Sequence, residues 1–215
     1  MSQAATAGVA AEKVLGAPGA IIVIISGPSG VGKDTIIRWL KQREASPERH
    51  FVVTYKTRSP RDGEVEGVDY QFVSVDEFRR LMEEGRLLEA SEVHGHWSGT
   101  PRDQVEEALT SGRDVILKID VQGAEKVKSL VPGALRIFVA PPSEAEREQR
   151  ITERGTETKE ELARRRKDAE IEMRRRSEYD HVLVNETGQA NETAQKIHRI
   201  IEQEHARHPR RRVSL

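Results

Sequence analysis

The sequence predicts an α/β fold of three layers, in which a mainly parallel sheet lies between helices. Apolar, β-branched segments recur along the chain, and most of them are separated by stretches with helical spacing of apolar residues. Strands that alternate with helices need right-handed crossovers, which place helices on both faces of the sheet. The expected strands are residues 21–25, 51–55, 115–119, 135–139 and 182–184, and the expected helices include residues 35–44, 76–84, 122–129 and 159–179.

The first of these strands leads into a glycine-rich loop. Residues 20–25 are all aliphatic, as in a strand that is buried on both faces, and residues 27–33 read Gly-Pro-Ser-Gly-Val-Gly-Lys. Such a loop is suited to polyphosphate, because glycines let backbone N–H groups turn toward phosphate oxygens and the following helix adds its positive end. Lys33 adds a full charge. An ordinary strand-to-helix turn is the alternative, but the buried strand and the helical spacing of Ile36, Trp39 and Leu40 favour a P-loop.

The residue after the P-loop lysine departs from the pattern. A P-loop has Ser or Thr there, whose hydroxyl binds Mg²⁺. This chain has Asp34, and Thr35 is the first hydroxyl, one position late. The sequence therefore predicts a phosphate site in which the Mg²⁺ coordination differs from the usual one.

The composition excludes several other kinds of site. The chain has 215 residues, enough for one large domain with small insertions, and no cysteine, which excludes disulfides and thiolate chemistry. The formal net charge of −1 gives no overall field that favours nucleic acid. There is no transmembrane run, and residues 1–18 lack the pattern of a secretory signal. We expect a cytoplasmic protein with neither nucleic acid nor membrane as a partner.

A second candidate anion site lies in the stretch that follows the second strand. Arg58 and Arg61 are three residues apart, and Pro60 between them stiffens the chain, so both guanidinium groups could grip one phosphate. Tyr70 could add a hydroxyl donor. The alternative is a charged surface hairpin, and the composition of this stretch alone does not decide between the two.

Four stretches, taken together and in this order, resemble guanylate kinases. They are the P-loop, Thr57-Arg-Ser-Pro-Arg-Asp-Gly-Glu64 with Asp69-Tyr70, Ile119-Asp-Val-Gln-Gly123, and Arg154-Gly-Thr-Glu-Thr158. The resemblance runs from about residue 20 to about residue 205. It implies an enzyme that transfers the terminal phosphate of ATP to GMP, and also to dGMP, with Mg²⁺ as cofactor. It also implies a P-loop core with a GMP-binding insert and a mobile helical lid.

The resemblance assigns roles to the residues at matching positions. ATP would contact Gly27, Pro28, Ser29, Gly30, Val31, Gly32, Lys33, Asp34, Thr35 and Asn185, the last at adenine. GMP would contact Thr54, Arg58, Arg61, Glu64, Tyr70, Glu89, Thr100 and Asp120, with Thr54, Glu89 and Thr100 at guanine. The catalytic residues would be Lys33, Arg58, Arg150, Arg154 and Arg165. Mg²⁺ would be held, directly or through water, by Asp34, Thr35 and Asp120.

The chain departs from the family pattern at three positions. Asp34 replaces the usual Ser, Lys118 replaces an acidic residue, and Ser98 replaces a phosphate-binding Tyr. Since one of the first two changes adds an anion and the other a cation, we hypothesise that they compensate each other. The change at Ser98 predicts that one GMP phosphate contact is lost or comes from another group, such as the neighbouring Trp97.

These assignments divide the chain into a core, an insert, a lid and two disordered ends. The core comprises residues 19–53, 101–141 and 167–207, the insert residues 54–100, and the lid residues 142–166. Residues 1–18 are rich in Ala and Gly, and residues 208–215 are basic, so both ends are expected to be disordered.

Three other functions remain open from the sequence. A GTPase would explain Asp120-Val-Gln-Gly123 as a switch element, but the chain has no Asn-Lys-x-Asp segment to read guanine. A non-enzymatic interaction module would have a damaged P-loop or lid, whereas Lys33, Arg154 and Arg165 are present. A P-loop kinase for another nucleoside monophosphate or for a sugar phosphate is the third.

Overall fold

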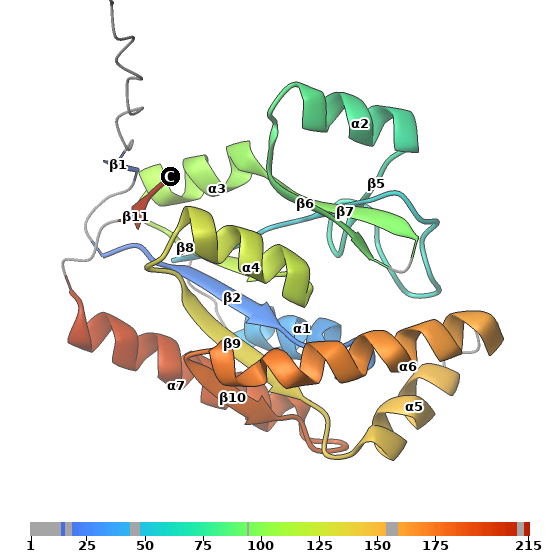
Figure 1. The fold of residues 1–215 in the computed structure, drawn as a ribbon. Helices are drawn as coiled ribbons and strands as arrows, with labels where there is room; N and C mark the ends of the chain where they lie inside the picture. Colours follow the sequence, from blue (N-terminus) through green and yellow to red (C-terminus); the bar gives the residue numbers. More distant parts are fainter. Residues whose placement is uncertain (1–13, 16–18, 44–47, 94, 154–158, 210–212) are drawn as a thin grey trace, which may run out of the picture.

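The computed structural model describes residues 14–15, 19–43, 48–93, 95–153, 159–209 and 213–215 (Figure 1). A five-stranded parallel sheet lies at its centre, in the order β10-β9-β2-β8-β3. The strands are β2 (Ile22–Ser26), β3 (Arg49–Phe51), β8 (Asp114–Lys118), β9 (Leu135–Ala140) and β10 (His181–Val184). The predicted α/β fold with a parallel sheet is confirmed.

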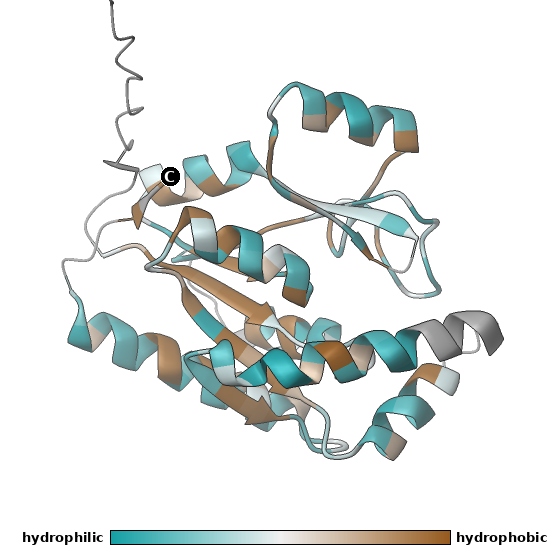
Figure 2. Ribbon diagram, viewed as in Figure 1, coloured by the Kyte–Doolittle hydropathy of each residue, from teal (hydrophilic) through white to brown (hydrophobic). Residues whose placement is uncertain are grey.

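Helices cover both faces of this sheet. Successive residues of β2 point to opposite faces, so Ile22 and Ile24 enter one core while Val23 and Ile25 enter the other. Figure 2 shows the resulting apolar strands between helices whose outer faces are polar. Helices α3 (Arg102–Thr110) and α4 (Val121–Leu130) contribute to the first core, and α1 (Lys33–Arg43) and α7 (Ala190–Arg207) to the second.

A second, smaller sheet stands apart from the first in Figure 1. Its order is β5-β4-β7-β6, and its strands are β4 (Tyr55–Lys56), β5 (Gln71–Phe72), β6 (Leu87–Val93) and β7 (His96–Pro101). Helix α2 (Val75–Glu83) buries Phe78 and Leu81 against Leu87 and Trp97 to give the insert its own small core. The β4–β7 and β6–β7 pairs are antiparallel, and the β4–β5 pair is parallel.

Two helices follow the Pro141-Pro142 pair at the end of β9. They are α5 (Glu144–Thr152) and α6 (Lys159–Arg174), and a short 3₁₀ turn (Arg175–Glu178) leads from α6 into β10. The N-cap residue Ser143 accepts a hydrogen bond from the backbone N–H of Glu146, which fixes the start of α5. Both helices lie beside the carboxyl end of the sheet, where β2 runs into the P-loop (Figure 1).

Several expected elements differ from the structure. The strand expected at residues 51–55 is two strands in different sheets, because the chain leaves the main sheet after Phe51 and the side chain of Gln104 accepts from the N–H of Val53. Trp39 is exposed, and the buried face of α1 carries Ile36, Ile37 and Leu40 instead. The expected helix at residues 159–179 ends at Arg174. Helices α3 and α7 were not among the predicted elements.

The two ends of the chain meet, which corrects the expectation that all of both ends is disordered. Strand β1 (Val14–Leu15) pairs antiparallel with β11 (Val213–Ser214), and the Val213 side chain packs into the core beside α3 and α4. Residues 1–13, 16–18 and 210–212 lie outside the described part of the chain. Within the described ranges, no helix has the length and apolar character needed to cross a membrane.

Candidate active site

The P-loop connects β2 to α1 and is shaped by glycine. Gly27, Gly30 and Gly32 have φ values of 139°, 89° and 90°, a region that other residues rarely adopt. A Cβ atom on Gly27 would stand 2.1 Å from the carbonyl oxygen of Val139, so β9 leaves no room for a side chain there. The N-terminus of α1, with its unpaired N–H groups, opens at Lys33.

The Lys33 ammonium is held by the P-loop itself. It donates hydrogen bonds to the carbonyl oxygens of Gly27 and, at 3.0 Å, Pro28. Burial lowers the pKa of Lys33, while Glu172 and Asp34 oppose that shift. A phosphate oxygen could replace the two carbonyl oxygens as the acceptor for Lys33, because a charged acceptor forms a stronger hydrogen bond with an ammonium group.

Two side chains from outside the loop fix its backbone. Arg147 on α5 is 1% exposed, and its guanidinium donates to the carbonyl oxygen of Ser29 at 3.2 Å. The Asn185 amide donates to the carbonyl oxygen of Val31 at 2.8 Å and accepts from the Thr193 hydroxyl at 3.0 Å. Arg147 was not predicted as a site residue. The Asn185 side chain therefore supports the loop, and its expected contact with adenine stays a prediction.

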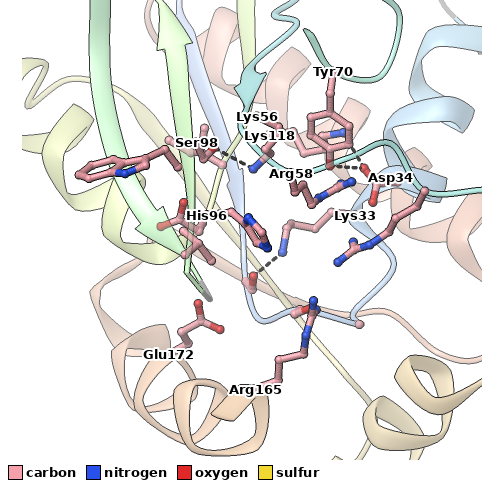
Figure 3. Close-up of a pocket in the computed structure, with 18 of the residues that line it drawn as sticks. Lys33, Asp34, Lys56, Arg58, Tyr70, His96, Ser98, Lys118, Arg165 and Glu172 are labelled. Carbon is pink, nitrogen blue, oxygen red and sulfur yellow. Dashed lines mark hydrogen bonds and ion pairs between the residues drawn. The ribbon is translucent and has the colours of Figure 1, made fainter. Parts of the chain in front are cut away.

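The arginines expected in the lid are placed differently from one another. Arg165 on α6 is buried and donates to the Ser29 hydroxyl at 2.8 Å, so it stands at the P-loop (Figure 3). Arg150 on α5 donates to the Asn185 carbonyl oxygen and to the Thr187 hydroxyl, at 3.2 and 2.7 Å. It is not among the described residues that line the cleft, so its expected contact with the transferring phosphate stays a prediction. Arg154 lies outside the described residues.

The expected GMP phosphate site is held by a salt bridge within the insert. The two terminal nitrogens of Arg58 donate hydrogen bonds to the two carboxylate oxygens of Glu64, at 2.7 and 2.6 Å. Glu64 also accepts a hydrogen bond from the backbone N–H of Arg61 at 2.9 Å. Bidentate pairing of this kind fixes the plane of the guanidinium. Glu64 is therefore placed to position Arg58, and it is not among the described residues that line the main cleft. The Arg58 guanidinium lies 5.4 Å from the ring centre of Tyr70.

One cleft brings the P-loop and the insert together. Figure 3 shows basic side chains from both parts pointing into it, with Arg165 and Glu172 on the side of α6. The fold brings the two parts close together, because the insert follows the edge strand β3, and only β8 separates β3 from β2 in the parallel sheet. The basic residues that line the cleft are Lys33, Lys56, Arg58, Arg61, Lys118 and Arg165, and the acidic ones are Asp34, Asp120 and Glu172.

The two charge changes at positions 34 and 118 form a direct ion pair. The Lys118 ammonium lies 2.5 Å from Asp34 Oδ1, and the Tyr70 hydroxyl donates to the same oxygen at 2.8 Å. Burial disfavours charge on Asp34, yet the Lys118 ammonium and the Tyr70 hydroxyl hold the pKa of this carboxyl well below its usual range. Burial and the Asp34 charge raise the pKa of Tyr70 to about 12, so its hydroxyl keeps its proton. A residue of the P-loop helix thus orients a residue of the insert.

The residues expected at guanine lie together on the insert but do not belong to the described lining of the cleft. Glu89 on β6 is 5% exposed and accepts hydrogen bonds from Thr100 at 2.7 Å and Ser91 at 3.2 Å. Burial raises the pKa of Glu89 to about 7. The hydroxyl of Thr54 is buried and has no hydrogen-bond partner among the described residues. A buried hydroxyl of this kind can serve as a hydrogen-bond partner for a bound ligand. Ser91 was not predicted.

The expected Mg²⁺ ligands fit an ion that arrives with a nucleotide. Mg²⁺ usually keeps several waters and takes one or two carboxylates besides substrate phosphates. Asp34 lines the cleft, and both of its hydrogen bonds use Oδ1. Asp120 also lines it and caps α4 through Oδ1, which accepts from the N–H groups of Gln122 and Gly123. Among the described residues no cluster of three acidic or His side chains forms a protein-only metal site.

Thr35 is not among the described residues that line the main cleft. It is exposed and lines a neighbouring hollow with Arg38 and Asp62, and Asp34 lines both the cleft and this hollow. The expected role of Thr35 as a Mg²⁺ ligand stays a prediction. Glu172, which was not predicted, does face the cleft, and burial raises its pKa to about 7. Glu172 lies among many other charged residues of α6, so the sequence alone did not single it out.

Comparisons with known proteins agree with this geometry. A family model described as "Guanylate kinase" matches residues 20–204. A guanylate kinase of Mycobacterium sp. (strain MCS) is 46% identical over 166 residues, which cover 76% of this chain and 83% of that protein. One from Thermosynechococcus vestitus is 47% identical over 169 residues, covering 79% and 87%. The crystal structure of guanylate kinase from Anaplasma phagocytophilum is similar with a TM-score of 0.67 at 34% identity, covering 90% of this chain and 88% of that one.

Proposed function

The chain belongs to the guanylate kinase family and phosphorylates GMP to GDP with ATP, and we propose that the cleft between the P-loop and the insert is where the transfer takes place. One observation carries the proposal: Lys33 of the P-loop and Arg58 of the insert line the same cleft. A donor and an acceptor phosphate held from opposite sides are already close and aligned for in-line transfer. We place the enzyme in the cytoplasm, where its two nucleotide substrates are found.

The donor phosphates would bind at the P-loop. The backbone N–H groups at the start of α1 and the glycine-rich turn supply donors and a positive dipole end. We propose that Lys33 leaves the carbonyl oxygens of Gly27 and Pro28 to contact a phosphate, and that Arg165, which is already at Ser29, contacts the transferring group. The transition state spreads negative charge over the phosphoryl oxygens, so cations fixed beforehand stabilise it without later rearrangement.

The acceptor phosphate would bind at the insert. Arg58 is oriented by its two hydrogen bonds to Glu64, and the Tyr70 hydroxyl is oriented by Asp34. Together with Arg61 these groups would hold the phosphate of GMP. Because the Tyr70 hydroxyl is bonded to a residue of the P-loop helix, the acceptor site and the donor site are tied by a direct contact.

Guanine would bind at Glu89, Thr100 and Thr54. An ionised carboxylate can accept from both the N1–H and the exocyclic amino group of guanine, and adenine offers no such pair. The buried Thr54 hydroxyl supports this assignment, because a base would supply the partner that it lacks among the described residues. None of these contacts involves the ribose 2′ position, so we propose that dGMP is also an acceptor.

Mg²⁺, when bound with ATP, would neutralise charge on the phosphates and help to align them. We propose that Asp34 and Asp120 hold it, directly or through water, each with the carboxylate oxygen that is not used in the hydrogen bonds described above. Lys118 would keep Asp34 ionised and in place. In this way a carboxylate–ammonium pair would replace the hydroxyl and the acidic residue that are usual in the family.

This pairing predicts the outcome of a charge-swap experiment. Asp34→Ser leaves Lys118 without its partner, and Lys118→Glu places two carboxylates side by side, so each change should lower kcat by about tenfold or more. The double variant restores the usual arrangement and should recover most of the lost turnover. Steady-state rates across a Mg²⁺ titration measure this directly. If the two losses simply multiply in the double variant, the two residues do not compensate each other.

The test of the proposed function is the comparison of two activities in the same preparation. A kinase with this cleft forms ADP from ATP only when GMP is present, because water must be excluded from the site to suppress hydrolysis. A GTPase would instead hydrolyse GTP without an acceptor. We expect GMP-dependent ADP formation and negligible GTP hydrolysis; the reverse result would favour the switch-element reading of residues 120–123.

A further inference from the structure

Lys56 is a cleft residue that the sequence comparison with the family left without a role. It lies on β4 directly opposite Ser98 on β7, and its ammonium donates a hydrogen bond to the Ser98 hydroxyl at 2.7 Å. Residues opposite each other on antiparallel strands have neighbouring Cβ atoms, so their side chains share one place on the sheet face. Both residues line the cleft together with Arg58, Arg61 and Tyr70 (Figure 3).

Lys56 occupies the space that a tyrosine at position 98 would otherwise fill. A Tyr at position 98 would extend a long side chain with a terminal hydroxyl, whereas serine ends close to the strand. The Lys56 side chain reaches this position from the neighbouring strand and puts an ammonium just beyond the serine hydroxyl. Trp97 also lines the cleft, but its ring packs on Phe78 at the core of the insert, with 5.8 Å between ring centres, so Lys56 is the better candidate for a phosphate contact.

The charges around Lys56 favour an anion. Its hydrogen bond goes to a neutral hydroxyl, and its ammonium stands 5.3 Å from the ring centre of Tyr70, which also lies within 5.4 Å of the Arg58 guanidinium. Burial, together with the nearby Lys118 and Arg58, lowers the pKa of Lys56 to about 8, although Asp120 and Glu89 oppose the shift. A partly dehydrated cation among other cations is poorly compensated until an anion binds.

We propose that Lys56 binds the 5′-phosphate of the acceptor nucleotide, in the place of the longer side chain that position 98 lacks. This inference rests on the proposed function and adds a residue to its acceptor site. The ammonium, Arg58, Arg61 and the Tyr70 hydroxyl then surround one phosphate, and the Ser98 hydroxyl positions the ammonium. The phosphate dianion in turn stabilises the charged form of Lys56, so GMP binding takes up a proton above pH 8.

The test uses Lys56→Met, which keeps the length of the apolar stem and removes the charge. Loss of one charge-assisted hydrogen bond should raise the KM for GMP by about ten- to a hundredfold, with little change in the KM for ATP. Inhibition by guanosine, which has no phosphate, should be unchanged. In the wild type the KM for GMP should rise above pH 8, and this rise should be absent from the variant.

Two further variants make the result specific. In Lys56→Ala/Ser98→Tyr the shorter residue 56 leaves room for the tyrosine, so most of the affinity for GMP that Lys56→Ala alone loses should return. Lys126→Met removes a lysine that contacts the same insert, at the Ala90 carbonyl, but is not among the described residues that line the cleft; its KM for GMP should stay within about twofold of the wild type. Thermal unfolding checks that Lys56→Met folds, and its Tm should not fall, because a dehydrated charge is removed.

Three outcomes would overturn the proposal. They are a KM for GMP within twofold of the wild type in Lys56→Met, an equal loss of guanosine affinity, which would make Lys56 a base contact, and a double variant no better than Lys56→Ala alone. These outcomes differ from a failure of the proposed function, which would appear as a wild-type enzyme that does not use GMP at all.

Discussion

Replacing Arg165 by methionine should lower kcat by at least about a hundredfold, with a much smaller effect on the KM for GMP. The guanidinium is buried at the P-loop, 2.8 Å from the Ser29 hydroxyl, where it can reach the oxygens of the transferring phosphate. An arginine that stabilises the charge of a phosphoryl-transfer transition state contributes about 10³–10⁵ in rate. Initial rates at saturating ATP and GMP measure the effect.

The neighbouring Arg166 provides a matched control. It is exposed and pairs with Glu148, so Arg166→Met removes the same charge from the same helix without touching the cleft, and kcat should stay within about twofold of the wild type. A loss of tenfold or less in Arg165→Met would mean that Arg165 supports the P-loop rather than the reaction. Arg165→Lys should recover only part of the rate, because lysine keeps the charge but not the planar donor geometry.

Replacing Glu89 by glutamine should lower kcat/KM for GMP by at least about a hundredfold and leave the KM for ATP nearly unchanged. The carboxylate is buried and oriented by Thr100 and Ser91, and the glutamine amide would present a donor where guanine also presents donors. A site whose buried polar groups pair with those of a substrate loses much of its affinity for that substrate when one of these groups is left unpaired. Glu92→Gln, an exposed position on the same strand, is the control.

The pH dependence of GMP binding checks the same residue independently. Burial raises the pKa of Glu89 to about 7, so the ionised form that can accept from guanine is complete above that pH and is lost as the pH falls through it. The KM for GMP should therefore rise below pH 7 in the wild type. Titration of the GMP phosphate contributes to both proteins, so Glu89→Gln should retain only that smaller dependence. Identical pH profiles would show that Glu89 does not meet the base in its ionised form.

Much of the fold and the P-loop could be predicted, because their signals are local. A buried parallel strand appears as a continuous aliphatic run, and a loop that bends around phosphate needs glycine at fixed positions. Both signals occur within residues 20–33, so this segment could be predicted from its own residues. The division of residues 51–55 between two sheets could not be read in this way. Its cause is a long-range contact, the hydrogen bond from the N–H of Val53 to Gln104.

The contacts that tune the site were harder to predict, since they join residues far apart in the chain. The opposite charges of Asp34 and Lys118 suggested a pair, and the structure places them 2.5 Å apart, but nothing local indicated that Tyr70 would bond to the same carboxylate. Arg147 and Arg150 are three residues apart on a charged helix. Only the packing of α5 shows that Arg147 turns toward Ser29. The proposed role of Lys56 likewise depends on its pairing with Ser98 on the neighbouring strand, which the sequence alone does not show.

The most direct test of the account is a comparison of acceptors at saturating Mg²⁺ and ATP. Initial rates of ADP formation should be measured with GMP, dGMP, AMP, UMP and CMP in turn. GMP should be the best substrate and dGMP should also be used. The other three should have kcat/KM values lower by at least about a hundredfold, because they cannot pair with Glu89 as guanine would. Comparable use of AMP, or ADP formation that is independent of any acceptor, would contradict the account.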